Sequence, residues 1–286
     1  MTTTTLDSVT SRDGTVIGYR RLGDGPGVVV LHGAMSSSHN HVQLAKALAD
    51  AFTVYVVDRR GRGLSGPYRE DHSIQSEVDD LAAVLDTVGA HSVFGCSSGA
   101  IITLEAARAL PTLQRIAIFE PPLFADRRTP EAVLTRFDKA MANGNVAGAL
   151  VAGMKGAQMG PPAFNLLPSK LLELLTSKAM SLEERRGTNG YVPMRELAPT
   201  LHYDFQLVAE LSGSMERYQA ISADVLLLGG SKSPAYLKRA LDALARSLPE
   251  AERVELAGVG HAAAWNADRR GKPVEVAHEL RRFFAE

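Results

Sequence analysis

Cysteine is nearly absent from this sequence of 286 residues, which contains only Cys96. A single cysteine excludes an intrachain disulfide framework and is typical of a reducing cytoplasm. A chain of this length can bury most of its core, so it needs neither disulfides nor a structural metal for stability. We therefore expect a cytoplasmic protein that folds without a metal.

Long hydrophobic runs are also missing. The longest apolar stretches, such as VLLL at 225–228, are far too short to cross a bilayer. The N-terminal residues MTTTTLDS lack the basic start and apolar stretch of a secretory signal. These absences argue against a membrane partner and favour a soluble protein inside the cell.

Neither sign of charge predominates. Lysine and arginine together number 31, aspartate and glutamate 32, and the formal net charge is -1 at pH 7. Nucleic-acid binding favours a clustered basic surplus, which this balance does not provide. We therefore expect a small-molecule substrate and no nucleic-acid partner, while the oligomeric state stays open.

The first 120 residues alternate between apolar strands and amphipathic helices. Residues 7–22 predict a hairpin around Asp13 and Gly14. Continuous apolar runs then predict buried strands at 27–33, 52–58, 91–95 and 115–120, with helices at 41–50, 73–89 and 98–111. Such alternation indicates an α/β fold with a mostly parallel sheet and helices on both faces.

The alternation stops after residue 120 and resumes at residue 224. Helical patterns occupy the interval at 133–143, 169–180 and 200–211, and the later elements are strands 224–230 and 253–258 and helices 235–247 and 274–284. We predict a sheet-containing core in two parts, 1–120 and 223–286, with a helical lid at 121–222. A peripheral helical decoration is the alternative.

The predicted lid is rich in large apolar side chains. They are Met141, Met154, Met159, Phe164, Leu166, Leu167, Leu171 and Met180. They favour a roomy apolar pocket, although such side chains also form the packing core between helices.

Ser97 is the candidate nucleophile. It is central in GCSSG at 95–99, which fits G-x-S-x-G between an apolar strand and a helix. A sharp turn there holds the serine in a strained conformation above the sheet, and the two glycines leave room for it. We expect Cys96 to pack beneath this turn as a small buried residue.

A second turn, His32-Gly33-Ala34, follows the first buried strand. In a parallel sheet this turn lies beside the nucleophile. A backbone N–H of Gly33 or Ala34, with that of Ser98, would then form an oxyanion hole. The alternative is an ordinary turn that requires glycine. We expect His32 to shape the loop by hydrogen bonding rather than to transfer protons.

His261 is the candidate base, because in enzymes with this nucleophile turn the histidine comes last along the chain. It follows the last predicted strand in GVGH at 258–261. The remaining histidines are expected to be solvated at helix ends or faces, and they are His39, His41, His72, His91 and His278. His202 lies in the lid, where we expect a packing role or a contact with substrate.

Glu120 is the candidate acid. The loop after the strand at 224–230, a common place for this residue, contains no carboxylate, whereas the strand at 115–120 ends in Glu120. A carboxylate closing an apolar strand needs a partner, and an N–H of His261 could supply one. Alternatives are a solvated Glu120 or, more remotely, Asp126. Asp58 is expected to organise the RRGRG turn at 59–63.

Four segments make the chain resemble the α/β-hydrolase superfamily: LHGAMSSS, VVDRRGRGLS, GCSSGA and GVGHAA. GCSSGA with a glutamate after the next strand is similar to zearalenone-type lactone hydrolases, which place the triad acid after that strand, so the resemblance favours Glu120. Haloalkane dehalogenases and epoxide hydrolases have an aspartate where this chain has Ser97, which argues against those reactions.

The resemblance and the residues together imply hydrolysis of a carboxylic ester or lactone through an acyl-enzyme, with no metal or organic cofactor. The alternatives are another reaction of the same triad, such as carbon–carbon bond hydrolysis, perhydrolysis or acyl transfer, and a non-catalytic ligand-binding protein.

Overall fold

The computed structural model describes residues 3–159 and 167–285. The chain divides into two compact units, Met1–Pro122 with Ser214–Glu286, and Leu123–Gly213. The described part of the first unit contains an eight-stranded sheet, and that of the second is helical.

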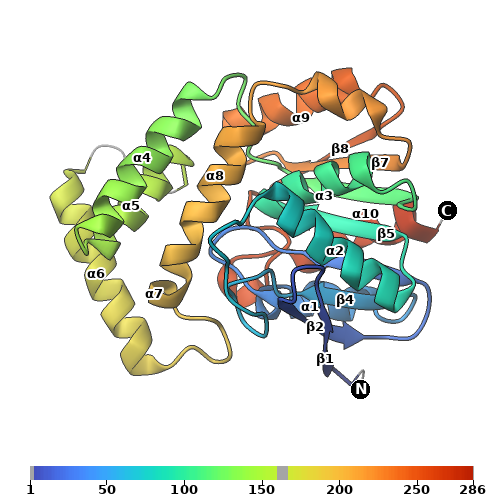
Figure 1. Cartoon of the computed structure of the whole chain (residues 1–286), viewed down its shortest axis with the longest axis horizontal. Coiled ribbons are helices and arrows are strands. Elements are labelled where there is room, and N and C mark those ends of the chain that lie inside the picture. The colour runs from blue at the N-terminus through green and yellow to red at the C-terminus, as the bar shows by residue number, and fades with distance from the viewer. Residues whose placement is uncertain (1–2, 160–166, 286) are drawn as a thin grey trace. The chain divides into compact units, whose positions relative to one another are not determined.

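The sheet of the first unit is mostly parallel (Figure 1). Its strand order is β1-β2-β4-β3-β5-β6-β7-β8, in which β2 pairs antiparallel with β1 and β4 and every other pair is parallel. The strands are β1 (Thr5–Thr10), β2 (Val16–Leu22), β3 (Gly27–Leu31), β4 (Thr53–Val57), β5 (Ser92–Cys96), β6 (Arg115–Phe119), β7 (Asp224–Gly230) and β8 (Glu252–Leu256). The predicted α/β fold is confirmed.

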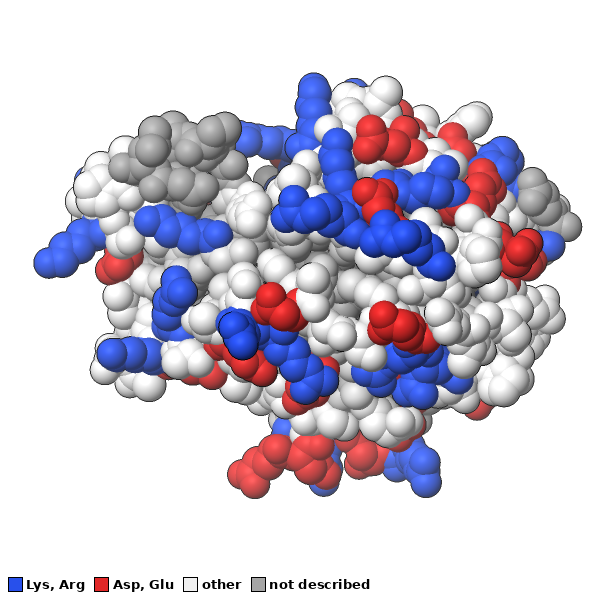
Figure 2. All heavy atoms as spheres, turned by 90° about the horizontal axis from the view of Figure 1, so that it is seen from above, with Lys and Arg blue, Asp and Glu red and all other residues white. Residues whose placement is uncertain are grey.

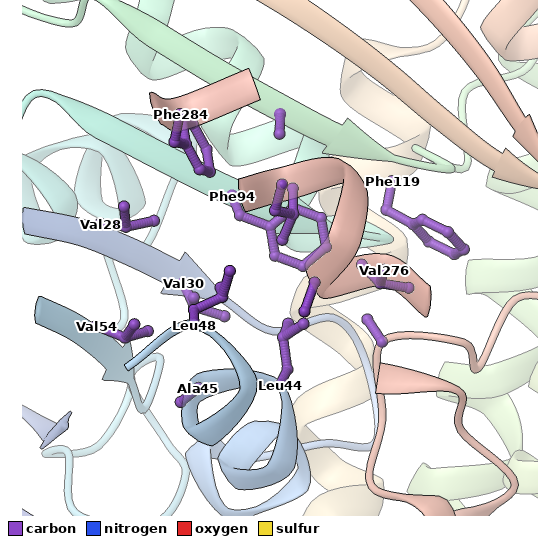
Figure 3. Packing of buried hydrophobic residues seen from close by; sticks show 14 of the residues in the cluster. Val28, Val30, Leu44, Ala45, Leu48, Val54, Phe94, Phe119, Val276 and Phe284 are labelled. Atoms are coloured by element: carbon purple, nitrogen blue, oxygen red, sulfur yellow. The ribbon is translucent and has the colours of Figure 1, made fainter. Parts of the chain in front are cut away.

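Helices cover this sheet. They are α1 (Val42–Leu48), α2 (Ile74–Val88), α3 (Ser98–Ala109), α9 (Ala235–Ser247) and α10 (Pro273–Ala285). On one face, Val28 and Val30 of β3 and Phe94 of β5 pack with Leu44 of α1 and Val276 of α10 (Figure 3). Continuous apolar runs suit these strands because both of their faces are removed from water.

The strand register brings four loops to one edge of the sheet. Leu31 of β3 lies opposite Gly95 of β5, and Phe119 of β6 lies between Cys96 of β5 and Leu228 of β7. Because these strands are parallel, the chain leaves all of them at the same edge. Ligands of open α/β sheets bind at this carboxyl edge.

The second unit contains α4 (Arg128–Ala142), α5 (Val146–Gly156), α6 (Ser169–Arg186), α7 (Met194–Leu197) and α8 (Leu201–Leu211). The sequence did not predict α5, whose glycines weaken a helical pattern. Packing explains them: a Cβ at Gly153 would lie 2.8 Å from the ring of Phe205, and one at Gly156 would overlap Val133. The glycines therefore allow neighbouring helices to approach.

The apolar residues of the second unit differ in exposure. Met180 is 2% exposed, whereas Leu167 and Leu171 are 37% and 42% exposed. Phe164 and Leu166 lie outside the described residues. None of the described helices combines the length and hydropathy needed to cross a membrane.

Candidate active site

Ser97 occupies the sharp turn between β5 and α3. Its φ of 55° and ψ of −125° are strained for a side-chain-bearing residue. Its N–H donates to the carbonyl of Phe119 on β6 at 2.9 Å, and its own carbonyl accepts the N–H of Ala100 at 2.9 Å. These bonds fix the turn, and the Ser97 side chain stays partly exposed.

The two glycines of this turn are required by close contacts. A Cβ at Gly95 would lie 2.5 Å from the carbonyl oxygen of Gly99 and would overlap Thr103 Oγ1. A Cβ at Gly99 would lie 2.6 Å from the carbonyl oxygen of Leu31. Both distances are shorter than a side chain tolerates, so the approach of α3 to β3 and β5 depends on glycine.

The loop after β3 lies against Ser97. A Cβ at Gly33 would lie 2.6 Å from Ser97 Cβ and 3.2 Å from its Oγ. Ala34 follows in the same loop, and Ser98 is the first residue of α3, where backbone N–H groups have no acceptor within the helix. The structure therefore brings Gly33 beside Ser97, at the N-terminus of a helix.

His32 is buried and uses both ring nitrogens. Nδ1 donates to the carbonyl of Gly33 at 2.8 Å, and Nε2 accepts the backbone N–H of Arg59 at 3.1 Å. Burial, followed by the nearby positive charge of Arg62 and Arg59, lowers the pKa of His32 well below its usual value. A neutral imidazole with both nitrogens engaged shapes the loop, as predicted.

Glu120 follows β6 and is 0% exposed. Its Oε1 accepts the backbone N–H of Gly230 at 2.6 Å, and its Oε2 accepts Nδ1–H of His261 at 2.7 Å. Its φ of 49° lies in the left-handed region that non-glycine residues seldom adopt. The structure thus satisfies this carboxylate with one partner on each oxygen instead of exposing it to water.

His261 lies in the loop after β8, with a side chain 13% exposed. Its ring stands 6.4 Å from that of Phe119, and Nδ1 is held by Glu120. With the proton on Nδ1, the lone pair of the neutral ring lies on Nε2. This tautomer is the one that a general base needs when the carboxylate binds the other nitrogen.

The loop after β7 supports Glu120 with backbone instead of a carboxylate. Gly230 donates its N–H to Glu120, and a Cβ at Gly230 would overlap the carbonyl of Val259, close to His261 in the chain. In the same loop, Ser233 is 8% exposed, and its hydroxyl has no hydrogen-bond partner among the described residues.

The other two acidic candidates have structural partners. Asp58 accepts the N–H and hydroxyl of Ser38 at 2.6 and 2.9 Å and the N–H of Leu64 at 3.1 Å, so it organises its turn as predicted. Asp126 is exposed and accepts the N–H of Arg128 at 2.9 Å, at the start of α4.

The prediction that five histidines are solvated was wrong for two of them. His41 is 0% exposed and His72 is 8% exposed. His41 donates from Nδ1 to the carbonyl of Ala264 at 3.0 Å and lies 3.9 Å from Cys96 Sγ. The polar segment around His41 is buried with its side chains hydrogen-bonded, His41 to the carbonyl of Ala264 and Ser38 to the carboxylate of Asp58. A polarity pattern does not reveal such partners. His202 pairs with Asp138 at 2.8 Å within the second unit.

Sequence reasoning missed a group of buried arginines. Arg59, Arg60 and Arg62 are at most 2% exposed. Arg59 pairs with Glu77, and Arg60 with Asp80, at 2.6 and 2.5 Å. The available signal was the RRGRG run directly after a buried strand, combined with two acids three residues apart on the helix at 73–89.

Comparison with known proteins gives the family. The sequence model of the family described as "Alpha/beta hydrolase family" matches residues 28–278, so the chain belongs to that family. A crystal structure of an alpha/beta hydrolase from Sphaerobacter thermophilus is similar, with a TM-score of 0.78 and 33% identity over 97% of this chain and 100% of that one.

Relatives with assigned reactions are more distant. The 2-(acetamidomethylene)succinate hydrolase of Mesorhizobium japonicum is 25% identical over 86% of this chain and 84% of its own length. The cis-3-alkyl-4-alkyloxetan-2-one decarboxylase of Shewanella oneidensis is 25% identical over 88% of this chain and 81% of its own length. An enol-lactonase from Burkholderia xenovorans shares the fold, with a TM-score of 0.69 and 19% identity over 98% of this chain and 100% of that one. This chain is accordingly a hydrolase of this fold.

Proposed function

We propose that this hydrolase cleaves a carboxylic ester or lactone through an acyl-enzyme, with Ser97 as nucleophile, His261 as base and Glu120 as acid. The main support is the buried Glu120 carboxylate, whose Oε2 lies 2.7 Å from His261 Nδ1. The strained turn that presents Ser97 on the neighbouring strand end gives independent support.

Acylation begins when Ser97 Oγ attacks the carbonyl carbon and its proton passes to His261 Nε2. The carbonyl oxygen becomes an oxyanion, which the N–H of Ser98 and that of Gly33 or Ala34 would stabilise. The C–O bond to the leaving alcohol then breaks, and the alcohol takes the proton from His261.

Deacylation repeats these steps with water. His261 takes a proton from water, the hydroxide attacks the acyl carbon, and the proton returns to Ser97 as the acid departs. From a lactone, the leaving alcohol stays attached to the acyl group, so the product is a hydroxy acid. Throughout, Glu120 holds the tautomer of His261 and stabilises the imidazolium. No step requires a metal or organic cofactor.

The zearalenone-type resemblance remains a hypothesis that rests on GCSSGA and Glu120. The relatives from Mesorhizobium japonicum and Shewanella oneidensis are named for different reactions. Pocket shape and water access therefore determine which reaction a triad of this kind catalyses. We also propose that the helical unit acts as a lid for an apolar small molecule. Its chain insertion begins three residues after Glu120, at Leu123.

A cytoplasmic location without nucleic-acid or membrane partners is also proposed. Cys96 is a buried free thiol, which suits a reducing compartment. Basic and acidic side chains both occur on the face shown in Figure 2, in line with the balanced charge of the whole sequence.

A fluorophosphonate probe tests the function directly, because it labels only an activated serine. We expect labelling of the wild type at Ser97, none of Ser97→Ala, and hydrolysis within a panel of lactones and p-nitrophenyl esters of graded chain length. Undiminished labelling of a folded Ser97→Ala variant would refute the assignment. A wild type that is labelled but cleaves no ester or lactone would favour another reaction of the triad.

A further inference from the structure

A buried ion pair lies next to the Gly33 loop and the Ser97 turn. The guanidinium of Arg59 donates to both carboxylate oxygens of Glu77, through Nε at 3.1 Å and Nη2 at 2.6 Å. The two side chains are 1% and 2% exposed. Burial alone would raise the pKa of Glu77, but the charge and hydrogen bonds of Arg59 outweigh burial and hold that pKa at about 2. The pair is therefore charged near neutral pH.

The same arginine is linked to both arms of the proposed oxyanion hole, directly to Ser98 and through His32 to Gly33. Its Nη1 donates to the hydroxyl of Ser98 at 3.1 Å. Its backbone N–H donates to Nε2 of His32 at 3.1 Å, and His32 donates to the carbonyl of Gly33 at 2.8 Å. Arg59 thus connects the first residue of α3 to the loop that lies against Ser97.

We propose that Arg59 is a positioning residue that sets the separation between the two N–H arms of the oxyanion hole. This inference rests on the proposed function. Donors of an oxyanion hole act when they lie about 2.7–3.1 Å from the developing oxyanion. A two-point bond between guanidinium and carboxylate defines an orientation as well as a distance. Arg59, fixed by Glu77, can therefore serve as a rigid spacer between the two arms.

Arg60 offers a matched control. It is 0% exposed and donates to both oxygens of Asp80, at 2.7 and 2.5 Å, and to Asp13 at 2.9 Å. Neither acid belongs to the candidate site. Removing the Arg60 guanidinium therefore breaks a buried ion pair of the same kind while leaving the bonds to Ser98 and His32 in place.

The experiment compares Arg59→Met and Arg60→Met in the full chain, with steady-state hydrolysis of the best ester or lactone found for the wild type. Both variants should lose stability, because each leaves a buried carboxylate without its main partner. Arg59→Met should also lose about ten- to a hundred-fold in kcat with little change in KM, as expected for misplaced donors. Arg60→Met should keep a kcat close to that of the wild type.

Inhibition by a trifluoromethyl ketone analogue of the substrate distinguishes positioning of the oxyanion hole from a purely structural role. Its adduct with Ser97 places an oxyanion in the hole. Its inhibition constant should therefore rise with the loss of kcat/KM in Arg59→Met, but not in Arg60→Met. If Arg59→Met does not fold, Ser98→Ala breaks the same contact from the other end and keeps the backbone N–H. Like Arg59→Met, Ser98→Ala should lower kcat and weaken binding of the ketone.

Equal kcat losses in the two arginine variants would overturn the positioning role. So would a folded Arg59→Met or Ser98→Ala variant that binds the ketone as tightly as the wild type. Failure of the proposed function is a separate outcome, because it appears as undiminished turnover by Ser97→Ala, whatever the arginine variants do.

Discussion

His261, in the loop after β8, and His32, in the loop after β3, have different kinds of hydrogen-bond partner. Nδ1 of His261 donates to the carboxylate of Glu120, and the side chain is 13% exposed. Nδ1 of His32 donates to a backbone carbonyl, as does that of His41 farther along the β3 loop, and both residues are 0% exposed. A carboxylate stabilises an imidazolium, whereas a carbonyl compensates poorly for lost hydration.

Burial determines the protonation of the two rings that bond to carbonyls. Burial lowers the pKa of His41 to about 4 and that of His32 well below its usual value, so both rings are neutral at pH 7. Burial likewise raises the pKa of the neighbouring Cys96 thiol to about 12, which keeps it protonated. Partners and burial, rather than residue type, thus distinguish a histidine suited to proton transfer from two that hold the structure.

The strongest test of this comparison is His261→Gln. This variant lacks the proposed base, so turnover should fall on the order of a million-fold while the protein still folds, because the proposed acyl-transfer steps would lose their proton acceptor. Single-turnover kinetics and circular dichroism would measure the two effects. Substantial turnover by the folded variant would mean that another group acts as the base.

Replacing the carboxylate partner should have the next largest effect. Glu120→Gln keeps the shape but removes the charge that supports the imidazolium, so kcat should fall by roughly three to four orders of magnitude. Steady-state hydrolysis with a thermal melt would check this. A folded Glu120→Gln variant that loses only a few-fold would show that another carboxylate serves His261.

His41→Leu should separate structure from catalysis. The variant has no donor for the carbonyl of Ala264, which should cost about 1–3 kcal/mol in the free energy of unfolding. We expect kcat to fall far less than in His261→Gln, because His41 lies outside the proposed triad. Urea denaturation would measure the loss in the free energy of unfolding, and steady-state kinetics would measure kcat. A catalytic loss equal to that of His261→Gln, with stability unchanged, would contradict the distinction.

Acid should lower the stability that buried, neutral His41 contributes to the folded protein. Below pH 6.5 the unfolded chain binds a proton at His41, whereas the folded chain does so only near pH 4. The stability that neutral His41 contributes is therefore complete above pH 6.5 and declines as the pH falls to 4, by up to about 1.4 kcal/mol per pH unit.

His41→Leu removes this linkage, so its stability deficit relative to the wild type should shrink over the same range. Denaturant titrations at several pH values would measure it. A constant deficit from pH 6.5 to 4 would show that His41 titrates alike in both states.

The smallest effect is expected at Ser233, in the loop that supports Glu120 through Gly230. Ser233→Ala should change kcat by a few-fold at most, as for a residue outside the triad. The melting temperature should stay equal or rise, because the substitution removes a buried hydroxyl that has no partner among the described residues. A large loss of kcat would assign this loop a direct role.

Much of the fold was predictable because it depends on local patterns. The strand expected at 224–230 and the helix expected at 235–247 are β7 and α9 with the same bounds. The helix α5 escaped prediction because its glycines are explained only by the neighbours they admit, such as Phe205. The burial of His41 escaped it because a polar residue has no local signal of burial when its partner is a distant carbonyl, here that of Ala264.

The sequence by itself determined the α/β alternation and the positions of Ser97, Glu120 and His261 after strands, because apolar runs, glycines and turns are local properties. Only the tertiary structure decided the partners. Glu120 and His261 are separated by 141 residues, and strand register and the β7 loop bring them together. The contacts of Arg59 with Glu77, Ser98 and His32 also depend on packing between separate elements. Partner choice follows from the folded geometry because a side chain's own sequence neighbours do not specify which distant group it will meet.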